Sequence, residues 1–183
     1  MRFMKKHFLL LGLLVALPAS AEGIYVFGDG GQSTFSVDFF DVVLSKTETT
    51  YGIGIGYEVN QTFSFELAYR DLGASDSADM YEKSKVEKSA VQASLLANYA
   101  VSPVVEVFGR LGVANLKSEG ISDIRDYSEN NTPTSLSNTK AFYGAGASYA
   151  ANEKLSFRGE YNRYSEWEGV TVSILTIGAV YKF

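Results

Sequence analysis

Acidic and basic side chains recur at even spacing in several short segments of the sequence, where they could form charged pairs. Glu66 and Arg70, like Glu106 and Arg110, lie four residues apart and would share one face of a β-strand. Paired carboxylates could act as general acid and base in a hydrolase, and a row of charges could line an ion path. The candidate charge network comprises Glu58, Glu66, Arg70, Glu106, Arg110, Arg158, Glu160 and Lys182.

The residues that most enzymes would need beside these carboxylates are missing. His7 is the only histidine, and the sequence has no cysteine. Activation of a hydroxyl needs a base with a pKa near neutrality, and imidazole is the usual one. Combinations such as Asp29 with Ser33, or Ser165 with Glu166, have no such base. We therefore expect no enzyme activity, no catalytic residue, no cofactor and no metal site.

The first 21 residues have the pattern of a secretory signal peptide. Three basic residues precede an apolar run over residues 8–17, and Ala19-Ser20-Ala21 supplies a small-x-small cleavage motif. The run is about half the ~20 residues of a membrane-spanning helix. We expect cleavage after Ala21, leaving one domain over residues 22–183. Loss of three basic residues leaves 13 against 21 acidic ones, a net charge of about −8 that argues against nucleic acid.

Alternating apolar and polar residues predict β-strands along the rest of the chain. The end of the chain is the clearest case, because every second residue, on one face of the expected strand, is apolar: Leu175, Ile177, Ala179, Tyr181 and Phe183. Large apolar residues alternate with glycines over residues 51–58, and the remaining expected strands cover 24–35, 63–70, 91–99, 105–113, 143–149, 155–162 and 175–183. Gly28, Gly30 and Gly31 leave the register of the first strand open, because they permit a bulge.

The connections between these strands alternate in length. Short ones lie near residues 60–61, 102–103 and 152–153, and long polar ones over 36–48, 73–88 and 117–139. Strands two, four, six and eight end on aromatic residues, which places an aromatic girdle at one membrane interface. A soluble β-sandwich gives no reason for this coincidence. We predict an all-β fold, a closed eight-stranded antiparallel transmembrane β-barrel.

Several segments resemble the OmpA-type outer-membrane barrel family, which includes small surface proteins of the opacity and Ail/OmpX kind. They are Phe65-Glu66-Leu67-Ala68-Tyr69-Arg70, Tyr143-Gly144-Ala145-Gly146, Arg158-Gly159-Glu160-Tyr161 and Val180-Tyr181-Lys182-Phe183. The resemblance implies the outer membrane of a Gram-negative bacterium, with lipid and lipopolysaccharide around a monomer. It also implies that the barrel-assembly machinery reads the terminal strand, a role carried over to Phe183 and Tyr181.

Two functions are compatible with such a barrel. Eight strands enclose a space that side chains just fill, so the charge network would plug the lumen and the external loops would carry a structural or adhesion-like role. A small porin is the alternative, in which the same charges line a path. Outer-leaflet lipid-modifying enzymes are disfavoured, because the catalytic sets of those families include a histidine.

The external loops offer candidate contacts with an unidentified host or surface partner. Phe39 and Phe40 belong to an apolar stretch, although alternation over residues 35–39 favours an extension of the first strand past the membrane. Lys83, Lys85 and Lys88 could pair with lipid phosphates as point charges, although Glu82 and Glu87 lie between them. Loop sequences diverge freely on such scaffolds, so the fold does not identify the partner.

Overall fold

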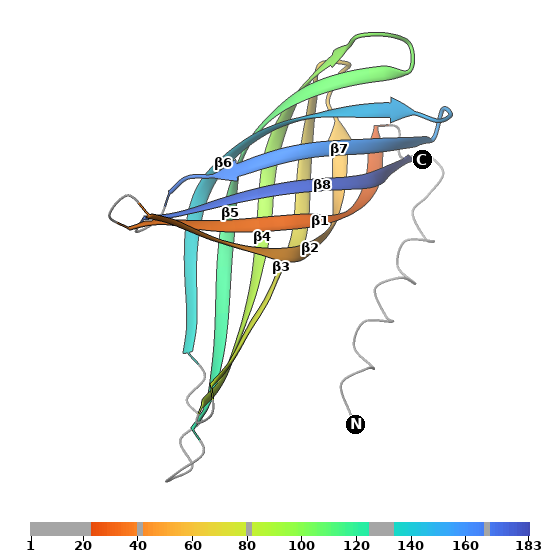
Figure 1. The fold of residues 1–183 in the computed structure, drawn as a ribbon. Coiled ribbons are helices and arrows are strands. Elements are labelled where there is room, and N and C mark those ends of the chain that lie inside the picture. The colour runs from red at the N-terminus through yellow and green to blue at the C-terminus, as the bar shows by residue number, and fades with distance from the viewer. Residues whose placement is uncertain (1–22, 40–41, 80–81, 125–133, 167–168) are drawn as a thin grey trace.

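Eight strands in chain order form a closed barrel in the computed structural model (Figure 1). The structure describes residues 23–39, 42–79, 82–124, 134–166 and 169–183. The strands are β1 (Ile24–Phe39), β2 (Val42–Glu58), β3 (Phe63–Asp79), β4 (Glu82–Ala100), β5 (Val105–Ile124), β6 (Thr134–Ala150), β7 (Leu155–Tyr164) and β8 (Val170–Lys182). The predicted all-β barrel with eight strands is confirmed. No helix in the described ranges has the length and hydropathy of a membrane span.

Every strand pairs antiparallel with its neighbours in the sequence, and β1 closes the barrel against β8. The closing ladder runs from Tyr25 opposite Lys182 to Val37 opposite Val170. It places Phe27 opposite Val180 without a shift in register, so the glycines of β1 introduce no bulge. Closure matters because the bilayer core has no water to hydrogen-bond a free strand edge.

The start of β1, the end of β8 and three tight turns lie at one end of the barrel, which we call the terminal end; the opposite end is the far end. The turns are closed by polar side chains that accept hydrogen bonds from the backbone. Asn60 Oδ1 accepts from the amides of Thr62 and Phe63, each at 2.8 Å. Asn152 Oδ1 accepts from Lys154 and Leu155, each at 2.9 Å. These Asx turns explain why such short polar segments suffice.

The exposure of side chains is inverted relative to a soluble protein. Ile177 is 76% exposed and Leu111 is 68% exposed, whereas Arg70 is 1% and Glu66 is 2% exposed. From the terminal end, the outward-facing residues of each strand are apolar up to a level at which the first polar one appears. On β2 that residue is Thr49, which follows Tyr51 on the outward face. The first polar outward residues on other strands are Asp71, Ser89, Asn115, Arg163 and Ser173. This apolar belt is the surface that lipid covers.

The expected aromatic girdle is present at the terminal end. Tyr57, Tyr99, Tyr149 and Tyr181 are all outward-facing and are between 42% and 71% exposed. They lie near the terminal end of their strands. There Tyr181 is opposite Leu155 in the β7–β8 ladder, and Tyr149 is opposite Phe157 in the β6–β7 ladder. Aromatic rings of this kind settle at the interface between hydrocarbon and water.

The long polar connections are not loops throughout, and the prediction was wrong in this respect. Strands β1 to β6 continue past the belt, so that β3 reaches Asp79 and β5 reaches Ile124. Polar residues on both faces of these extensions hide the alternation on which the sequence argument depended. Main-chain pairing maintains the strands where the side-chain pattern ends. For the first connection, the strand extension favoured above is confirmed as far as Phe39.

Glycines on even-numbered strands make room for large inward side chains on odd-numbered ones. An added Cβ at Gly54 would lie 2.3 Å from Phe27 Cζ and 2.5 Å from the Leu67 carbonyl oxygen. At Gly56 it would lie 2.0 Å from Tyr25 Cζ. The glycines therefore set how large the lumen side chains can be.

Substituting Gly54→Ala should destabilise the barrel, because the backbone carbonyl of Leu67 cannot move aside as a flexible side chain could. We expect a loss of about 1–3 kcal/mol in the free energy of unfolding, measured by urea titration of the refolded barrel in lipid. Gly109→Ala is the matched control, since no atom lies within 4 Å of its added Cβ. Equal stability of the two variants would contradict the packing argument.

Candidate functional site

The lumen charges lie on alternate strands. Asp29 is on β1, Glu66 and Arg70 on β3, Arg110 on β5, and Arg158 and Glu160 on β7. Opposite them stand small residues of the even-numbered strands; an added Cβ at Gly52 would lie 2.9 Å from both the Arg70 guanidinium and Asp29 Oδ1. Long side chains can thus cross the barrel and meet near its axis.

Glu66 is the centre of this network. Its Oε2 accepts a hydrogen bond from Arg110 Nη2 at 2.6 Å, and its Oε1 accepts one from Arg158 Nη1, also at 2.6 Å. The hydroxyl of Tyr25 donates to the same Oε1 at 2.9 Å. One carboxylate therefore ties β1, β5 and β7 to β3. Charge-assisted hydrogen bonds of this length are the stronger kind.

Glu160 provides the second acidic centre. Its Oε2 accepts from Arg110 Nη2 at 3.0 Å, and its Oε1 accepts from Asn162 Nδ2 at 2.7 Å. Arg158 Nε lies 3.6 Å away and Arg70 Nη2 lies 3.9 Å away. Glu160 thus connects the Glu66 centre to Arg70.

Asp29 and Arg70 form the third part of the network. Arg70 Nη1 and Nη2 donate to the two carboxylate oxygens of Asp29 at 2.6 and 2.9 Å. The side chains are 1% and 5% exposed. This fork-to-fork geometry matches a planar guanidinium to a planar carboxylate. Three acids therefore face three arginines in the interior.

Aromatic rings surround the guanidinium groups on the side of the network toward the terminal end. The Arg158 guanidinium carbon lies 4.5 Å from the centroid of Phe27 and 5.7 Å from that of Phe108. Phe27 also belongs to a small buried cluster with Tyr25, Ala68 and Val180. Stacking on a ring face limits the rotamers of the arginine while its charge stays paired.

An apolar cluster closes the lumen on the far side of the network. It contains Leu72, Ala90, Ala114, Phe142, Tyr164, Val172 and Ile174, with Phe35, Leu116 and Val170 packed against it. The rings of Phe142 and Tyr164 stack with centroids 5.3 Å apart. Gln92 Nε2 donates to the Tyr164 hydroxyl. Charged and apolar layers thus follow one another along the barrel axis.

The terminal end of the lumen is more open. Lys182 Nζ lies 2.5 Å from Glu58 Oε1, and these side chains are 44% and 35% exposed. They border a cavity of about 40 Å³, together with Glu106 and Arg158. The volume is comparable to that of about one water molecule. This end is a shallow polar mouth.

Of the eight residues predicted to form the charge network, five lie together in the buried centre: Glu66, Arg70, Arg110, Arg158 and Glu160. Glu58 and Lys182 form a separate pair at the mouth, where Glu106 also lies. Sequence reasoning left Asp29, Tyr25 and Asn162 out of the network. Asp29 is spaced by two residues from Phe27 and by four from Tyr25, so all three face the same side of β1. This spacing could have placed Asp29 in the network.

The residue pairs considered for catalysis are not assembled. Asp29 is bound to Arg70, and Ser33 Oγ instead donates to the Leu72 carbonyl oxygen at 2.7 Å. Ser165 and Glu166 are exposed at the end of β7.

The predicted external contacts are only partly described. Lys88 Nζ lies 3.9 Å from the centroid of the Phe35 ring, beyond the belt. Burial lowers the pKa of Lys88, nearby Glu48 opposes this shift, and Lys46 adds to it. Phe40 lies outside the described residues, as do the side chains of Phe39, Lys83 and Lys85.

The terminal strand presents the predicted apolar file to lipid. Leu175, Ile177 and Tyr181 are exposed, and the ring of Phe183 meets that of Tyr181 edge to face, with centroids 5.4 Å apart. Ala179 lies in the same file.

Neutralising Glu66 by Glu66→Gln should strongly destabilise the barrel, because two buried guanidiniums would lose their shared counter-charge. We expect a loss of about 3–5 kcal/mol in the free energy of unfolding. Glu58→Gln is the control at the half-exposed pair and should cost at most about 1 kcal/mol. Urea unfolding of both variants in the same lipid checks the difference; a smaller effect at Glu66 than at Glu58 would contradict it.

Three solved bacterial proteins illustrate the similarity of this fold to known barrels. Neisserial surface protein A matches with a TM-score of 0.68 and 17% identity, over 88% of this chain and 97% of that one. Ail of Yersinia pestis, in complex with the heparin analogue sucrose octasulfate, matches with a TM-score of 0.60 and 19% identity, over 87% and 99%. The N-terminal β-barrel domain of Pseudomonas aeruginosa OprF gives 0.58 and 14%, over 88% and 98%.

At these identities the solved structures support the fold alone. No curated protein matches the sequence. The family model described as the outer membrane protein beta-barrel domain matches residues 7–183, which is nearly the whole chain. The chain therefore belongs to the family of outer-membrane β-barrel domains, and its place is the outer membrane of a bacterial cell.

Proposed function

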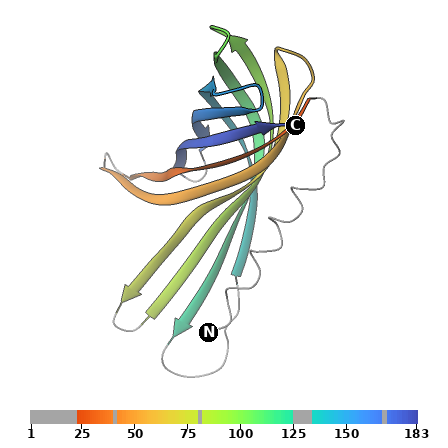
Figure 2. The ribbon, with the colours of Figure 1, turned by 90° about the vertical axis from the view of Figure 1, so that its right-hand side faces the viewer.

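We propose that this protein is a surface-exposed barrel that binds a partner through the strand extensions beyond the outer leaflet. The observation that carries the proposal is that the barrel divides there into two groups of strands (Figure 2). The β2–β3 ladder ends at Tyr51 opposite Asp71. Beyond it β2 continues with β1, and β3 continues with β4.

The division leaves sheet edges above the membrane. The β6–β7 ladder ends at Phe142 opposite Tyr164, whereas β6 continues to Thr134. Over residues 134–140 the described partner of β6 is β5. An edge of this kind can pair with an extended segment of another protein, with backbone hydrogen bonds supplying affinity and side chains supplying specificity. A surface or adhesion-like role uses this geometry directly.

Residues just above the belt suit the outer leaflet. Arg163 and Lys117 face outward and are exposed, in the region where lipopolysaccharide carries its phosphates. Lys83, Lys85 and Lys88, with Phe39 and Phe40, remain the candidate contacts at the strand tips. The heparin analogue bound to Ail is anionic, and it supports an anionic probe for this chain.

The filled lumen supports this function over a porin. The arginine–carboxylate network crosses the barrel, and the apolar cluster around Phe142 and Tyr164 lies beyond it. An ion would have to separate buried charge pairs and then cross an apolar layer, and both steps are costly. A lipid-modifying enzyme is disfavoured because the only histidine of the sequence is His7.

Three further assignments belong to the same proposal. Residues 1–21 act as a signal peptide that is cleaved after Ala21. The barrel-assembly machinery recognises the terminal strand through Phe183 and Tyr181, whose rings contact each other. The barrel works as a monomer, because its ladder closes upon itself.

Single-channel recording tests the filled lumen. We expect the refolded chain 22–183 to give no conductance steps in a planar bilayer, because the network and the apolar cluster block the axis. Unheated and boiled samples on a denaturing gel control for folding. Stable steps that change in Glu66→Gln or Arg110→Met would instead favour the porin.

Removing the tip of the β5–β6 extension tests partner binding. Replacing residues 118–138 by a short turn should leave heat-modifiable gel mobility unchanged, because the described parts of this segment, residues 118–124 and 134–138, lie beyond the belt. Adhesion of bacteria that display the variant to cultured epithelial cells should fall to the level of cells without the protein. Binding of sucrose octasulfate is measured in parallel. Glu58→Gln, at the opposite mouth, is the control, and unchanged adhesion by the deletion variant would exclude this extension as the binding surface.

A further inference from the structure

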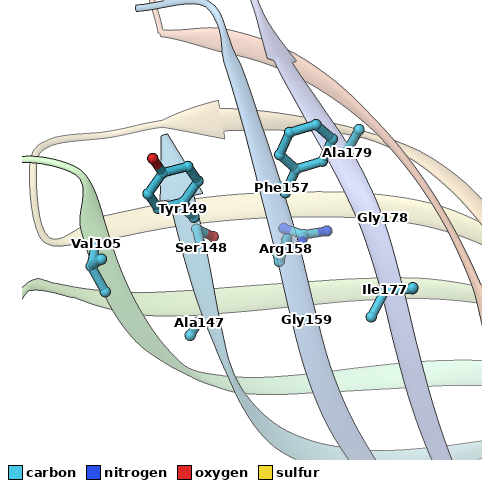
Figure 3. A pocket seen from close by; sticks show the side chains of 10 residues that line it. All are labelled: Val105, Ala147, Ser148, Tyr149, Phe157, Arg158, Gly159, Ile177, Gly178 and Ala179. Atoms are coloured by element: carbon cyan, nitrogen blue, oxygen red, sulfur yellow. The ribbon is translucent and has the colours of Figure 1, made fainter. Parts of the chain in front are cut away.

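Strand β6 has a backbone edge directly above the membrane belt. Inside the belt the strand is paired on both sides, and Tyr149 stands between Val105 of β5 and Phe157 of β7 (Figure 3). The ladder to β7 ends at Phe142, whereas the ladder to β5 continues to Thr134. One side of β6 therefore loses its neighbour where the strand leaves the membrane.

The turn after β7 explains why the edge is left. Strand β7 ends at Tyr164, and β8 begins at Val170. Gly169, between them, has φ of 79°, in the left-handed region that favours glycine. The chain turns there and returns into the barrel instead of following β6 outward.

The last hydrogen bond to β7 identifies the backbone groups that face the edge. The amide of Ser165 donates to the Ala141 carbonyl oxygen at 2.8 Å. In an antiparallel ladder the N–H and C=O of one residue point to the same side, and successive residues alternate. Thr139 and Ser137 therefore direct both groups to the β7 side, where no strand of the described ranges pairs with them. The groups of Asn138 face β5.

Side chains hold this edge in place without covering it. Asn115 of β5 donates from Nδ2 to Thr139 Oγ1 at 3.1 Å and accepts at Oδ1 from Ser137 Oγ at 3.0 Å. Thr139 and Ser137 are exposed, yet these bonds turn their hydroxyls toward β5. The edge is thus formed before a partner arrives, which lowers the ordering cost of binding.

Other edges above the membrane carry features that oppose pairing. Strand β3 has a β-bulge between Asp71 and Gly73 and further aspartates beyond it. Strand β2 carries the ion pair of Lys46 with Glu48, at 2.9 Å. Bulges and charges of this kind protect edges from added strands. Over residues 134–140 β6 has no acidic residue and no proline, and its ladder to β5 has no shift in register.

The register determines how an added strand would lie. It would run antiparallel to β6 and in line with β7, and its residues opposite Thr139 and Ser137 would face outward. Its residue opposite Asn138 would face inward, diagonal to Lys140. Diagonal neighbours of an antiparallel pair are within reach of long side chains. A second copy in the same membrane presents β6 in the same direction, which rules out antiparallel β6–β6 pairing.

The charges beside the edge indicate the chemistry of the partner. The basic residues among the described side chains there are Lys117, Lys140 and Arg163, and the acidic one is Glu166, which is exposed after the end of β7. The excess of cations favours an acidic segment. Lys140, which faces inward, is complementary to a carboxylate on the residue opposite Asn138.

We infer that the edge of β6 over residues 134–140 binds an extended acidic segment of another protein as an added strand, with a carboxylate opposite Asn138. The inference rests on the proposed partner binding and specifies its site. Backbone hydrogen bonds to Thr139 and Ser137 supply affinity, and the charge near Lys140 supplies selectivity. Threonine or valine on the partner suits the outward positions beside the β6 hydroxyls.

A proline at the edge tests the backbone contact with little effect on the barrel. The amide of Ser137 takes no part in the β5–β6 ladder, and proline is tolerated on edge strands at such positions. Ser137→Pro therefore removes an edge donor and places a ring where the partner would pair. Ser137→Ala is the matched control, because it also loses the hydrogen bond to Asn115 but keeps the amide. Thr139→Pro and Thr139→Ala repeat the comparison one pair nearer the membrane.

The probe is the heptapeptide Ser-Thr-Glu-Thr-Val-Thr-Ser, acetylated, amidated and labelled with fluorescein, and its binding to the folded barrel in nanodiscs is followed by anisotropy. The natural sequence and Ser137→Ala should bind it equally. Ser137→Pro should bind roughly tenfold more weakly, the size expected for loss of about one backbone hydrogen bond. The same peptide with N-methylthreonine should not bind, and lysine in place of its glutamate should weaken binding. Unheated and boiled samples on a denaturing gel confirm folding of each variant.

Hydrogen exchange provides a second measurement on the natural sequence. Peptide should slow exchange of the Ser137 and Thr139 amides and leave that of Asn138, which already faces β5, unchanged. Failure of the natural sequence to bind, or equal binding by the proline and alanine variants or by the N-methylated peptide, would overturn the inference. Equal binding of the lysine peptide would overturn the choice of an acidic partner.

The inference and the proposed function fail in different ways. Adhesion that is lost on deletion of residues 118–138, without any binding of the peptide, would keep the surface role and reject this edge. Peptide binding by a protein that confers no adhesion would keep the edge and reject the role in adhesion.

Discussion

The narrow interior of an eight-stranded barrel is the constraint on which the rest of this structure depends. Lipid requires every backbone group to be paired within the sheet, so the strands must close, and eight of them leave room only for interlocking side chains. Large residues therefore stand opposite small ones: around the charge network they come from odd-numbered strands, whereas in the far cluster Phe142 of β6 stands over Gly112 of β5. Tyr25 over Gly56, and Phe108 over Gly146, are two instances of this rule. The spacing that brings Glu66, Arg110 and Arg158 into contact is a consequence of the same rule.

That packing separates stability from function within the molecule. The buried charges are paired with one another, with Glu66 and Glu160 sharing Arg110 between them. Such a network tolerates change poorly, because a half-satisfied charge in the interior is costly. The outward surfaces face no such demand. The lipid belt needs only apolar character, and the extensions above it need only main-chain pairing, so a partner site can vary there without disturbing the core.

The strand pattern of the sequence predicts much of this arrangement. Alternation identifies the inward and outward files, the eight strands and five of the six charged residues of the buried centre. It fails where the pattern carries no information. Asp29 lies between glycines that permit either register, so its membership of the network depends on the β1–β8 ladder. The extensions beyond the belt are polar on both faces, so they resemble loops although the backbone pairs as far as Ile124. Which strands diverge depends on how far each pair of neighbours stays hydrogen-bonded, and the periodicity of the side chains does not determine that length.

The point of divergence has a local cause in β3. Register shifts between Asp71 and Gly73 in the β3–β4 ladder, which is the mark of a β-bulge. Gly73 has φ of 94°, and an added Cβ would lie 2.7 Å from Glu48 Cβ, so only glycine fits. The bulge is held by Asp71 Oδ1, which accepts from the Gly73 amide at 2.8 Å, and by the Ser33 hydroxyl, which donates to the Leu72 carbonyl oxygen. It lies where the β2–β3 ladder ends and the belt gives way to polar residues. Since a bulge bends its strand and increases the local twist, the same glycine that ends the membrane-spanning ladder also turns β3 away from β2 and opens the edges above the membrane.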